Sequence, residues 1–272
     1  MENMVAFVND FGGELGMEPS SYNSAMWGAI ESITQNAIAP IATLILTAIM
    51  LIELIGWVDS QNNMHTANDV IKGFMKFFIR LFIGIFLVSK SHDLTLMVFQ
   101  LSSYVISMSG GALSTEVSYS VISDASISAL QAELETRTIW SLVPMLLPSI
   151  LGWLGVFVVA AICRVIILGR VIQIYMYCSI GAIPYATFMN KELSGVGKNY
   201  IMNLFALAFQ GFFMLVAITI YGYMVASITY EAAITSFMGL TSINLKLICS
   251  GFALCFTLIG SKSLAKSIFN AH

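Results

Sequence analysis

Long apolar runs, separated by short polar stretches, dominate the sequence. The run over residues 37–57 reads AIAPIATLILTAIMLIELIGW and holds one ionisable residue, Glu53, near its end. A hydrocarbon core about 30 Å thick is crossed by roughly 20 apolar helical residues. Comparable runs lie at 74–88, 139–189, 201–226 and 245–260. The pattern predicts an all-α fold, a polytopic transmembrane helical bundle.

The segment 93–110 is amphipathic, with apolar residues at helical i, i+3 and i+4 spacing. Ser102, Ser103 and Ser107 interrupt this apolar pattern. The segment therefore predicts a helix that crosses the membrane, lines a pore or lies flat on the surface.

The longest run, 139–189, also permits two interpretations. Arg164, Gly169 and Arg170 interrupt it midway, so it forms either a tight hairpin near Gly169 or one long helix that projects past the membrane. Pro144 and Pro148 at its start are expected to kink or delay the helix. With one crossing here and none by 93–110, the chain crosses the membrane five times, which is our prediction; a crossing added by each segment gives seven.

The N-terminal part, residues 1–36, is acidic and has no Lys or Arg. Ser20 or Ser21 is expected to cap a short helix that lies in the membrane interface. Its apolar face holds Met26, Trp27, Ile30 and Ile33. We therefore divide the chain into an extracytoplasmic N-terminal segment, 1–36, and a transmembrane domain, 37–272, with a Ser-rich connector at 110–138.

The distribution of Lys and Arg predicts the orientation, because cytoplasmic loops are enriched in these residues. With five crossings and an outside N-terminus, the basic residues on the inside are Lys72, Lys76, Lys191, Lys198, Lys262 and Lys266. Those left outside are Lys90, Arg137 and Lys246. The N-terminus is therefore expected outside and the C-terminus inside, and seven crossings give the same orientation.

Composition agrees with a membrane protein and offers no catalytic centre. The chain is 58% hydrophobic and 10% charged, whereas soluble domains are about 25% charged. No HExxH, GxSxG, GxGD, Walker A or GxGxxG motif occurs. The four cysteines lie in apolar segments, where free thiols behave as small hydrophobes, and the three histidines are scattered. We expect no enzyme activity, no cofactor and no metal site.

Charged residues inside apolar runs are costly and often functional. In an antiparallel hairpin, Glu53 falls near Lys76 and Arg80, which makes an internal ion pair one interpretation. Lys72, Lys76 and Arg80 also lie on one helical face, where they form either a basic stripe that faces water or an anionic partner, or a set in which the two lysines extend to the membrane interface and Arg80 is paired internally. The candidate intramembrane polar or pore-lining residues are Arg80, Arg164, Arg170, Ser102, Ser103 and Ser107. For the Ser/Gly-rich stretch, close helix packing is the alternative.

Three blocks of sequence resemble a known family. They read ESITQNAIAPIATLILTAIMLIELI, NNMHTANDVIKGFMKFFIRLFIG and GRVIQIYMYCSIGAIPYATF. The chain resembles the TrbL-like polytopic inner-membrane subunits of type IV secretion and conjugation systems, with the Gram-positive branch nearest. We expect it to lack the large extracytoplasmic domain that some relatives carry.

The resemblance implies a multi-pass protein of the cytoplasmic membrane that forms part of the channel for a single-stranded DNA substrate and its attached relaxase. It also implies a homo-oligomeric ring, such as a pentamer, in contact with lipid and with secretion ATPases and bitopic membrane subunits. The alternatives are a non-conducting scaffold for this machinery and a small-solute transporter. Transporters often carry internal repeats with paired broken helices, and Pro144, Pro148 and Pro184 have no counterpart in the first half of the chain.

Overall fold

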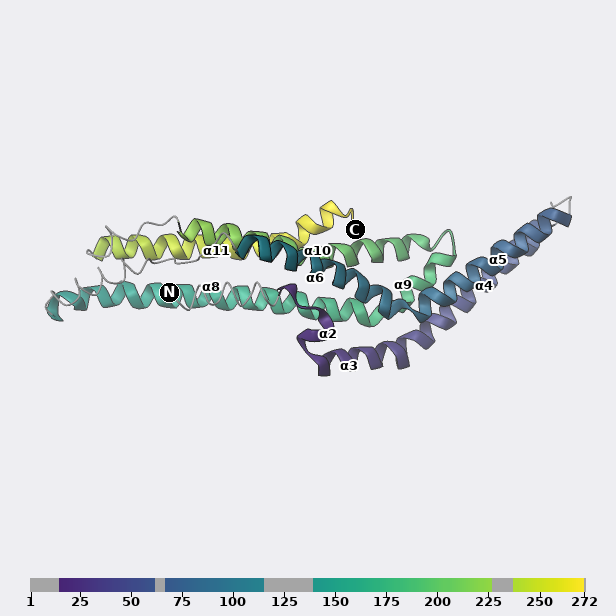
Figure 1. Cartoon of the computed structure of the whole chain (residues 1–272), viewed down its shortest axis with the longest axis horizontal. Helices are drawn as coiled ribbons and strands as arrows, with labels where there is room; N and C mark the ends of the chain where they lie inside the picture. The colour runs from purple at the N-terminus through teal and green to yellow at the C-terminus, as the bar shows by residue number, and fades with distance from the viewer. Residues whose placement is uncertain (1–14, 62–66, 115–138, 227–236, 272) are drawn as a thin grey trace. The chain divides into compact units, whose positions relative to one another are not determined.

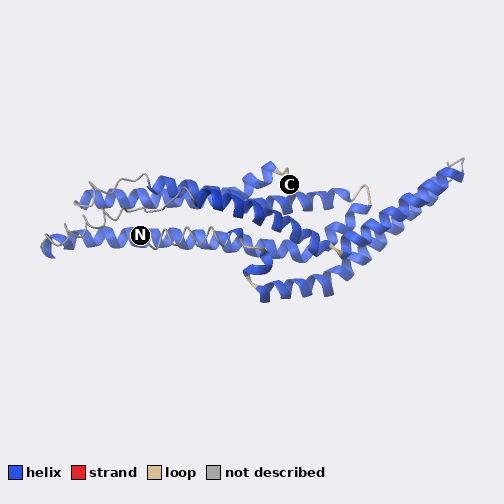
Figure 2. Ribbon diagram, in the orientation of Figure 1, coloured by secondary structure: helices blue, strands red, loops and turns tan. Residues whose placement is uncertain are grey.

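The computed structural model describes residues 15–61, 67–114, 139–226 and 237–271, and these residues form helices without any strand (Figures 1 and 2). This confirms the all-α prediction. The elements in chain order are α2 (Pro19–Tyr22), α3 (Ser24–Ile33), a π-helical turn (Thr34–Ile38), α4 (Ala39–Gln61), α5 (Ala67–Ser89), α6 (Ser91–Ser114), α8 (Ile139–Ile180), α9 (Ala182–Ala186), a 3₁₀ turn (Thr187–Met189), α10 (Ser194–Ala226) and α11 (Phe237–Ile268).

The chain divides into two compact units, which several helices traverse. Unit 1 comprises residues 1–17, 103–169 and 210–264, and unit 2 comprises 18–102, 170–209 and 265–272. This division follows contacts between helices, whereas the predicted boundary between 36 and 37 concerns membrane topology and stays a prediction.

In unit 1, α8 and α11 run parallel and approach each other closely. The Asn244 amide of α11 donates to the Pro148 carbonyl of α8 at 2.8 Å. Further along both helices, the sulfur of Cys255 lies 3.4 Å from the sulfur of Cys163. Glycines allow this approach, as small residues do in membrane helix interfaces. A Cβ added at Gly152 would lie 2.4 Å from the Asn244 Cγ.

In unit 2, α4 and α5 form an antiparallel hairpin, and α9 packs against both helices (Figure 1). The shared core is made of small and aliphatic side chains: Ala42, Leu46, Ile49, Met50, Val88, Ala182, Ala186 and Met189. Gly84 of α5 allows the approach, because a Cβ there would lie 2.8 Å from both Leu46 and Met189 side-chain atoms. The hairpin therefore has a fixed register on one side of the unit.

The N-terminal helix differs from the prediction in its cap. Ser20 and Ser21 lie inside α2, and Asn23 caps α3 by accepting a hydrogen bond from the Met26 N–H at 3.0 Å. The prediction of a serine cap is wrong because Asn23, two residues after Ser21, offers the same side-chain acceptor. Trp27 packs against the core of unit 2, and its ring centroid lies 4.7 Å from that of His92.

The helix continues from α3 into α4 through a π-helical turn over Thr34–Ile38. Pro40 lies two residues after this turn. It has no N–H to bond the carbonyl four residues earlier, and its ring would also press on that carbonyl. A single π turn relieves this conflict without ending the helix. Residues 24–59 are thus one candidate membrane span.

Among the described residues, four helical stretches are long and apolar enough to cross a membrane: 24–59, 146–180, 194–225 and 238–268. Their presence supports a multi-pass membrane protein. The apolar part of α5 carries Lys72, Lys76 and Arg80 and is not among them, so a fifth crossing by α5 stays a prediction. The orientation of the termini stays a prediction too.

The long apolar run after residue 139 is one helix. α8 has 42 residues and passes Gly169 without a turn, so the hairpin alternative is wrong. Its length is about 63 Å, twice a hydrocarbon core of ~30 Å. A turn inside an apolar run would expose backbone N–H and C=O groups to lipid, whereas a continuous helix satisfies them. Pro144 and Pro148 lie within α8 and do not delay its start.

The segment 93–110 is helical as predicted and belongs to α6. α6 is not among the four candidate spans of the described residues, and the preferred topology, in which this segment does not cross the membrane, stays a prediction. Of the Ser-rich connector, residues 115–138 lie outside the described part of the chain.

Candidate functional site

The structure brings Glu53 and Arg80 together in the α4–α5 hairpin. Arg80 Nη1 donates to Glu53 Oε2 at 2.7 Å, and the two side chains are 37% and 19% exposed. Lys76 lies on the exposed face of α5, and no salt bridge joins it to Glu53 in the described structure. The register of the hairpin therefore pairs Glu53 with Arg80, and the pair is neutral as a whole.

Arg170 lies on α8 in unit 2, and its side chain is 6% exposed. Nη2 donates to the Ala208 carbonyl of α10 at 3.3 Å, and Nε has no acceptor among the described residues. Within the described chain, the salt bridges are Arg80–Glu53 and Lys90–Asp93, so no described carboxylate neutralises Arg170. A buried cation that lacks an anionic partner is unfavourable, so burial of Arg170 is costly in this conformation.

Ser102 of α6 uses the same acceptor. Its hydroxyl is buried and donates to the Ala208 carbonyl at 2.5 Å. Three helices, α6, α8 and α10, thus meet at one carbonyl oxygen. We call Ser102, Arg170 and Ala208 the Ala208 junction.

Three other candidate pore-lining residues lie outside unit 2, which contains the Ala208 junction. Ser103, Ser107 and Arg164 belong to unit 1. Ser103 and Arg164 are half-buried, and Ser107 is exposed and donates to the Tyr104 carbonyl of its own helix at 2.9 Å. The Ser107 contact is the usual back-bonding of serine in a helix.

Sequence reasoning missed two amide side chains at helix contacts: Gln210, which is buried, and Asn244, which is half-buried. Gln210 of α10 is 5% exposed and donates from Nε2 to Ser261 Oγ of α11 at 3.3 Å. Its Oε1 has no partner in the described part of the chain. The available signal was a single amide within an apolar run, FALAFQGFF.

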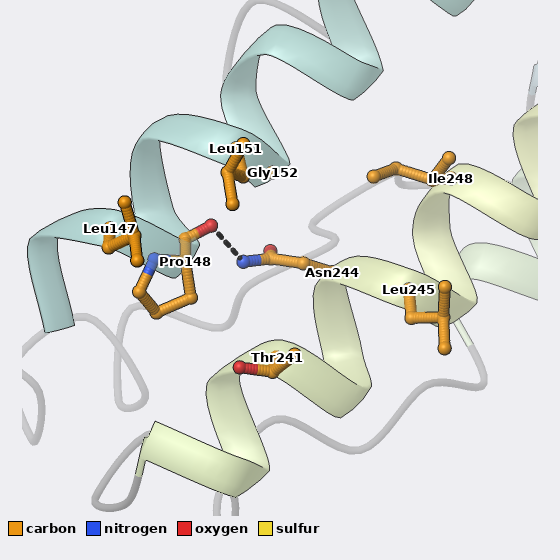
Figure 3. Close-up of a pocket in the computed structure, with 8 residues that line it drawn as sticks. All are labelled: Leu147, Pro148, Leu151, Gly152, Thr241, Asn244, Leu245 and Ile248. Atoms are coloured by element: carbon orange, nitrogen blue, oxygen red, sulfur yellow. Dashed lines mark hydrogen bonds between the residues drawn. The ribbon is translucent and has the colours of Figure 1, made fainter.

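The second missed residue is Asn244, which sits over Gly152 (Figure 3). The hydrogen bond from its amide to the Pro148 carbonyl crosses a groove of about 180 Å³ between α8 and α11. The rest of the groove is almost entirely apolar and is lined by Leu147, Leu151, Thr241, Leu245 and Ile248. The amide thus provides a polar contact inside an apolar helix interface.

The cysteines are free thiols in the structure. Cys163, Cys178 and Cys255 are buried, as expected, whereas Cys249 is exposed because it lies on the outward face of α11. In the described residues, no three His, Cys, Asp or Glu side chains gather as metal ligands would. Two of the three histidines, His65 and His272, lie outside the described residues.

A comparison with protein families gives one match. Residues 4–182 match the family described as TrbL/VirB6 plasmid conjugal transfer like protein. The match includes the Glu53–Arg80 pair, Ser102 and Arg170, and it ends before Ala208. Neither the curated proteins nor the solved structures gave a match.

Proposed function

Because this chain belongs to the TrbL/VirB6 family of plasmid conjugal transfer proteins, we propose that it is a subunit of the channel that carries single-stranded DNA, with its attached relaxase, across the cytoplasmic membrane. The observation that carries the proposal is the family match over 4–182 in a chain with four candidate membrane spans. Membership makes the chain a membrane subunit of a conjugal transfer system, and the channel role is the step beyond it.

The charges at membrane depth support a path for an anionic strand. A DNA strand carries one negative charge per nucleotide, so its path must be wet and free of unpaired acids. Glu53 meets this requirement because Arg80 pairs with it at 2.7 Å. The buried cation Arg170 adds positive charge without a described carboxylate beside it.

We further propose that several copies form a ring, with a pentamer as the expected assembly. In each unit, side chains pack into apolar cores, so the strand would pass between copies. α4 and α5 also expose large apolar side chains, which suit lipid or a neighbouring copy: Leu44, Ile52, Ile55, Phe74, Phe82 and Phe86. Secretion ATPases and bitopic subunits would be the further partners.

The proposed topology has five crossings, with residues 1–36 and the connector 110–138 outside and the C-terminus inside. This orientation leaves the basic loops in the cytoplasm. It also puts the turn after α9, with Lys191 and Lys198, on the side where the secretion ATPases act.

The test is deletion of the gene in a donor strain, with complementation by the intact gene as control. We expect loss of DNA transfer while relaxase nicking at the transfer origin continues. Formaldehyde crosslinking in the complemented donor should recover the transferred strand with this protein. Normal transfer from the deletion strain would refute a conjugal role, and loss of transfer without recovered DNA would favour the scaffold.

A further inference from the structure

The Ala208 junction holds a cation that its surroundings do not satisfy. A guanidinium has five N–H donors. For Arg170, one donor group is bonded, at 3.3 Å, and Nε has no acceptor in the described structure. The bonded carbonyl is shared, because Ser102 donates to it at the shorter distance of 2.5 Å. The conformation described here therefore buries Arg170 without using its capacity to bind an anion.

We propose that Arg170 is a concealed phosphate-binding residue of the DNA path, covered by α6 through Ser102 and uncovered when Ser102 leaves the Ala208 carbonyl. This inference rests on the proposed function, which supplies the anionic strand. In the covered state, the junction attaches α6 and α8 to one point on α10. In the open state, the planar guanidinium binds phosphate oxygens with two parallel N–H donors.

The surroundings favour a passing strand over a permanent anion. Arg170 is enclosed by three helices of its own chain and is 6% exposed, so neither a partner's carboxylate nor a lipid headgroup reaches it without movement of a helix. A permanently bound anion would be expected to have a preformed binding site beside the guanidinium. A residue that meets its ligand during transport needs exposure only at that moment.

The first experiment compares Arg170→Met, Arg170→Lys and Lys76→Met in the full-length protein in donor cells. Methionine keeps much of the apolar stem but removes the charge, and lysine keeps the charge but loses the planar fork. Lys76→Met is the matched control, since it removes one positive charge from an exposed site. Membrane accumulation, transfer frequency and DNA recovered by formaldehyde crosslinking are measured together.

We expect Arg170→Met to accumulate at least as well as the wild type, because an uncompensated buried charge is removed. Its transfer should fall at least 100-fold and its recovered DNA at least 10-fold, while Arg170→Lys stays within 10-fold of the wild type and Lys76→Met transfers normally. Wild-type transfer by Arg170→Met would overturn the inference. Failure of Arg170→Met to accumulate would also overturn it, because the guanidinium would then act in packing.

The second experiment tests the uncovering step with thiol labelling in a cysteine-free background. Ser102→Cys should react with a maleimide in donors that transfer DNA and stay unreactive in donors without the coupling ATPase. Thr95→Cys is the control, because Thr95 is also fully buried on α6. It should stay unreactive in both strains, and equal labelling of Ser102→Cys in the two strains would overturn the covering role of α6.

A lipid phosphate is distinguished by its own readout. Loss of copurifying phospholipid from Arg170→Met, with unchanged DNA recovery, would overturn the inference in favour of a lipid site. Failure of the proposed function has a different signature, since the deletion strain would then transfer DNA normally. If the deletion abolishes transfer and Arg170→Met does not, the present inference alone fails.

Discussion

Replacement of Gly152 by alanine tests the packing of α8 against α11 most directly. The added Cβ would lie 2.4 Å from Asn244 Cγ and 2.6 Å from both Nδ2 and Oδ1. The amide must move away, and this movement breaks its 2.8 Å hydrogen bond to the Pro148 carbonyl. Gly169, on the same helix, is the matched control because a Cβ there meets nothing within 4 Å.

The size of the effect follows from three contributions. Repacking of the Asn244 side chain against the added methyl costs about 1–3 kcal/mol. Loss of a side-chain hydrogen bond between membrane helices costs about 0.6 kcal/mol. The gain in helix propensity, about 1 kcal/mol for alanine over glycine, is common to Gly152→Ala and Gly169→Ala and cancels in their comparison. The two variants should therefore differ by about 1.5–3.5 kcal/mol in the free energy of separating α8 from α11.

The assay uses the buried thiols of Cys163 and Cys255 at the same interface, with the other two cysteines replaced. Alkylation of these thiols in detergent requires separation of the helices, so its rate reports the open population. We expect Gly152→Ala to react roughly 10- to 300-fold faster than Gly169→Ala, since 1.4 kcal/mol is a factor of ten. In the Asn244→Ala background, the added methyl of Gly152→Ala should cause no further acceleration. Equal rates for the two glycine variants would refute the close approach of α8 and α11.

Three further predictions concern the ion pair of the hairpin, two buried thiols and the orientation of the C-terminus. The double variant Glu53→Gln/Arg80→Gln should accumulate in membranes about threefold better than Glu53→Gln alone, as measured by immunoblot, because the pair is coupled by ~0.6 kcal/mol. Additive losses of accumulation would contradict the pairing. A membrane-permeant oxidant such as iodine should link Cys163 to Cys255 within one chain, detected by peptide mapping without reductant; no link would contradict the parallel packing. A cysteine placed at Ser267, which is exposed, should react with an impermeant maleimide only after permeabilisation of the cells, and labelling of intact cells would contradict an inside C-terminus.

The helices and the hairpin contact were accessible to sequence reasoning because they depend on local patterns. Apolar runs of span length have few alternatives to helix in lipid, so the all-α fold follows from hydropathy. Glu53 and Arg80 lie on consecutive helices joined by a short polar segment, and antiparallel packing then brings only a few residues within reach. The choice of Arg80 over Lys76 required the register set by contacts such as Gly84 with Leu46.

The turns and caps were less predictable because several residues offered the same chemistry. Asn23 and the two serines before it all carry N-cap acceptors, and the structure selects Asn23. Gly169 carried a turn signal but lies in a continuous helix, since its apolar neighbours favour a helix with all backbone groups bonded. Within an apolar run, a residue that favours a turn is overridden where an apolar environment requires every backbone N–H and C=O to be bonded.

The Ala208 junction shows why the partner of an arginine in an apolar run does not follow from its neighbours in the sequence. Arg80 and Arg170 both interrupt apolar runs, yet one pairs with a carboxylate and the other donates to a backbone carbonyl. A carbonyl acceptor leaves no trace in the sequence, because every residue has one. The packing of α6, α8 and α10 places the Ala208 carbonyl beside Arg170, and it brings no described carboxylate to the guanidinium. The physical difference between the two arginines is therefore whether their charge is neutralised within the described structure, and this difference is why the proposal of a phosphate-binding residue rests on Arg170 and not on Arg80.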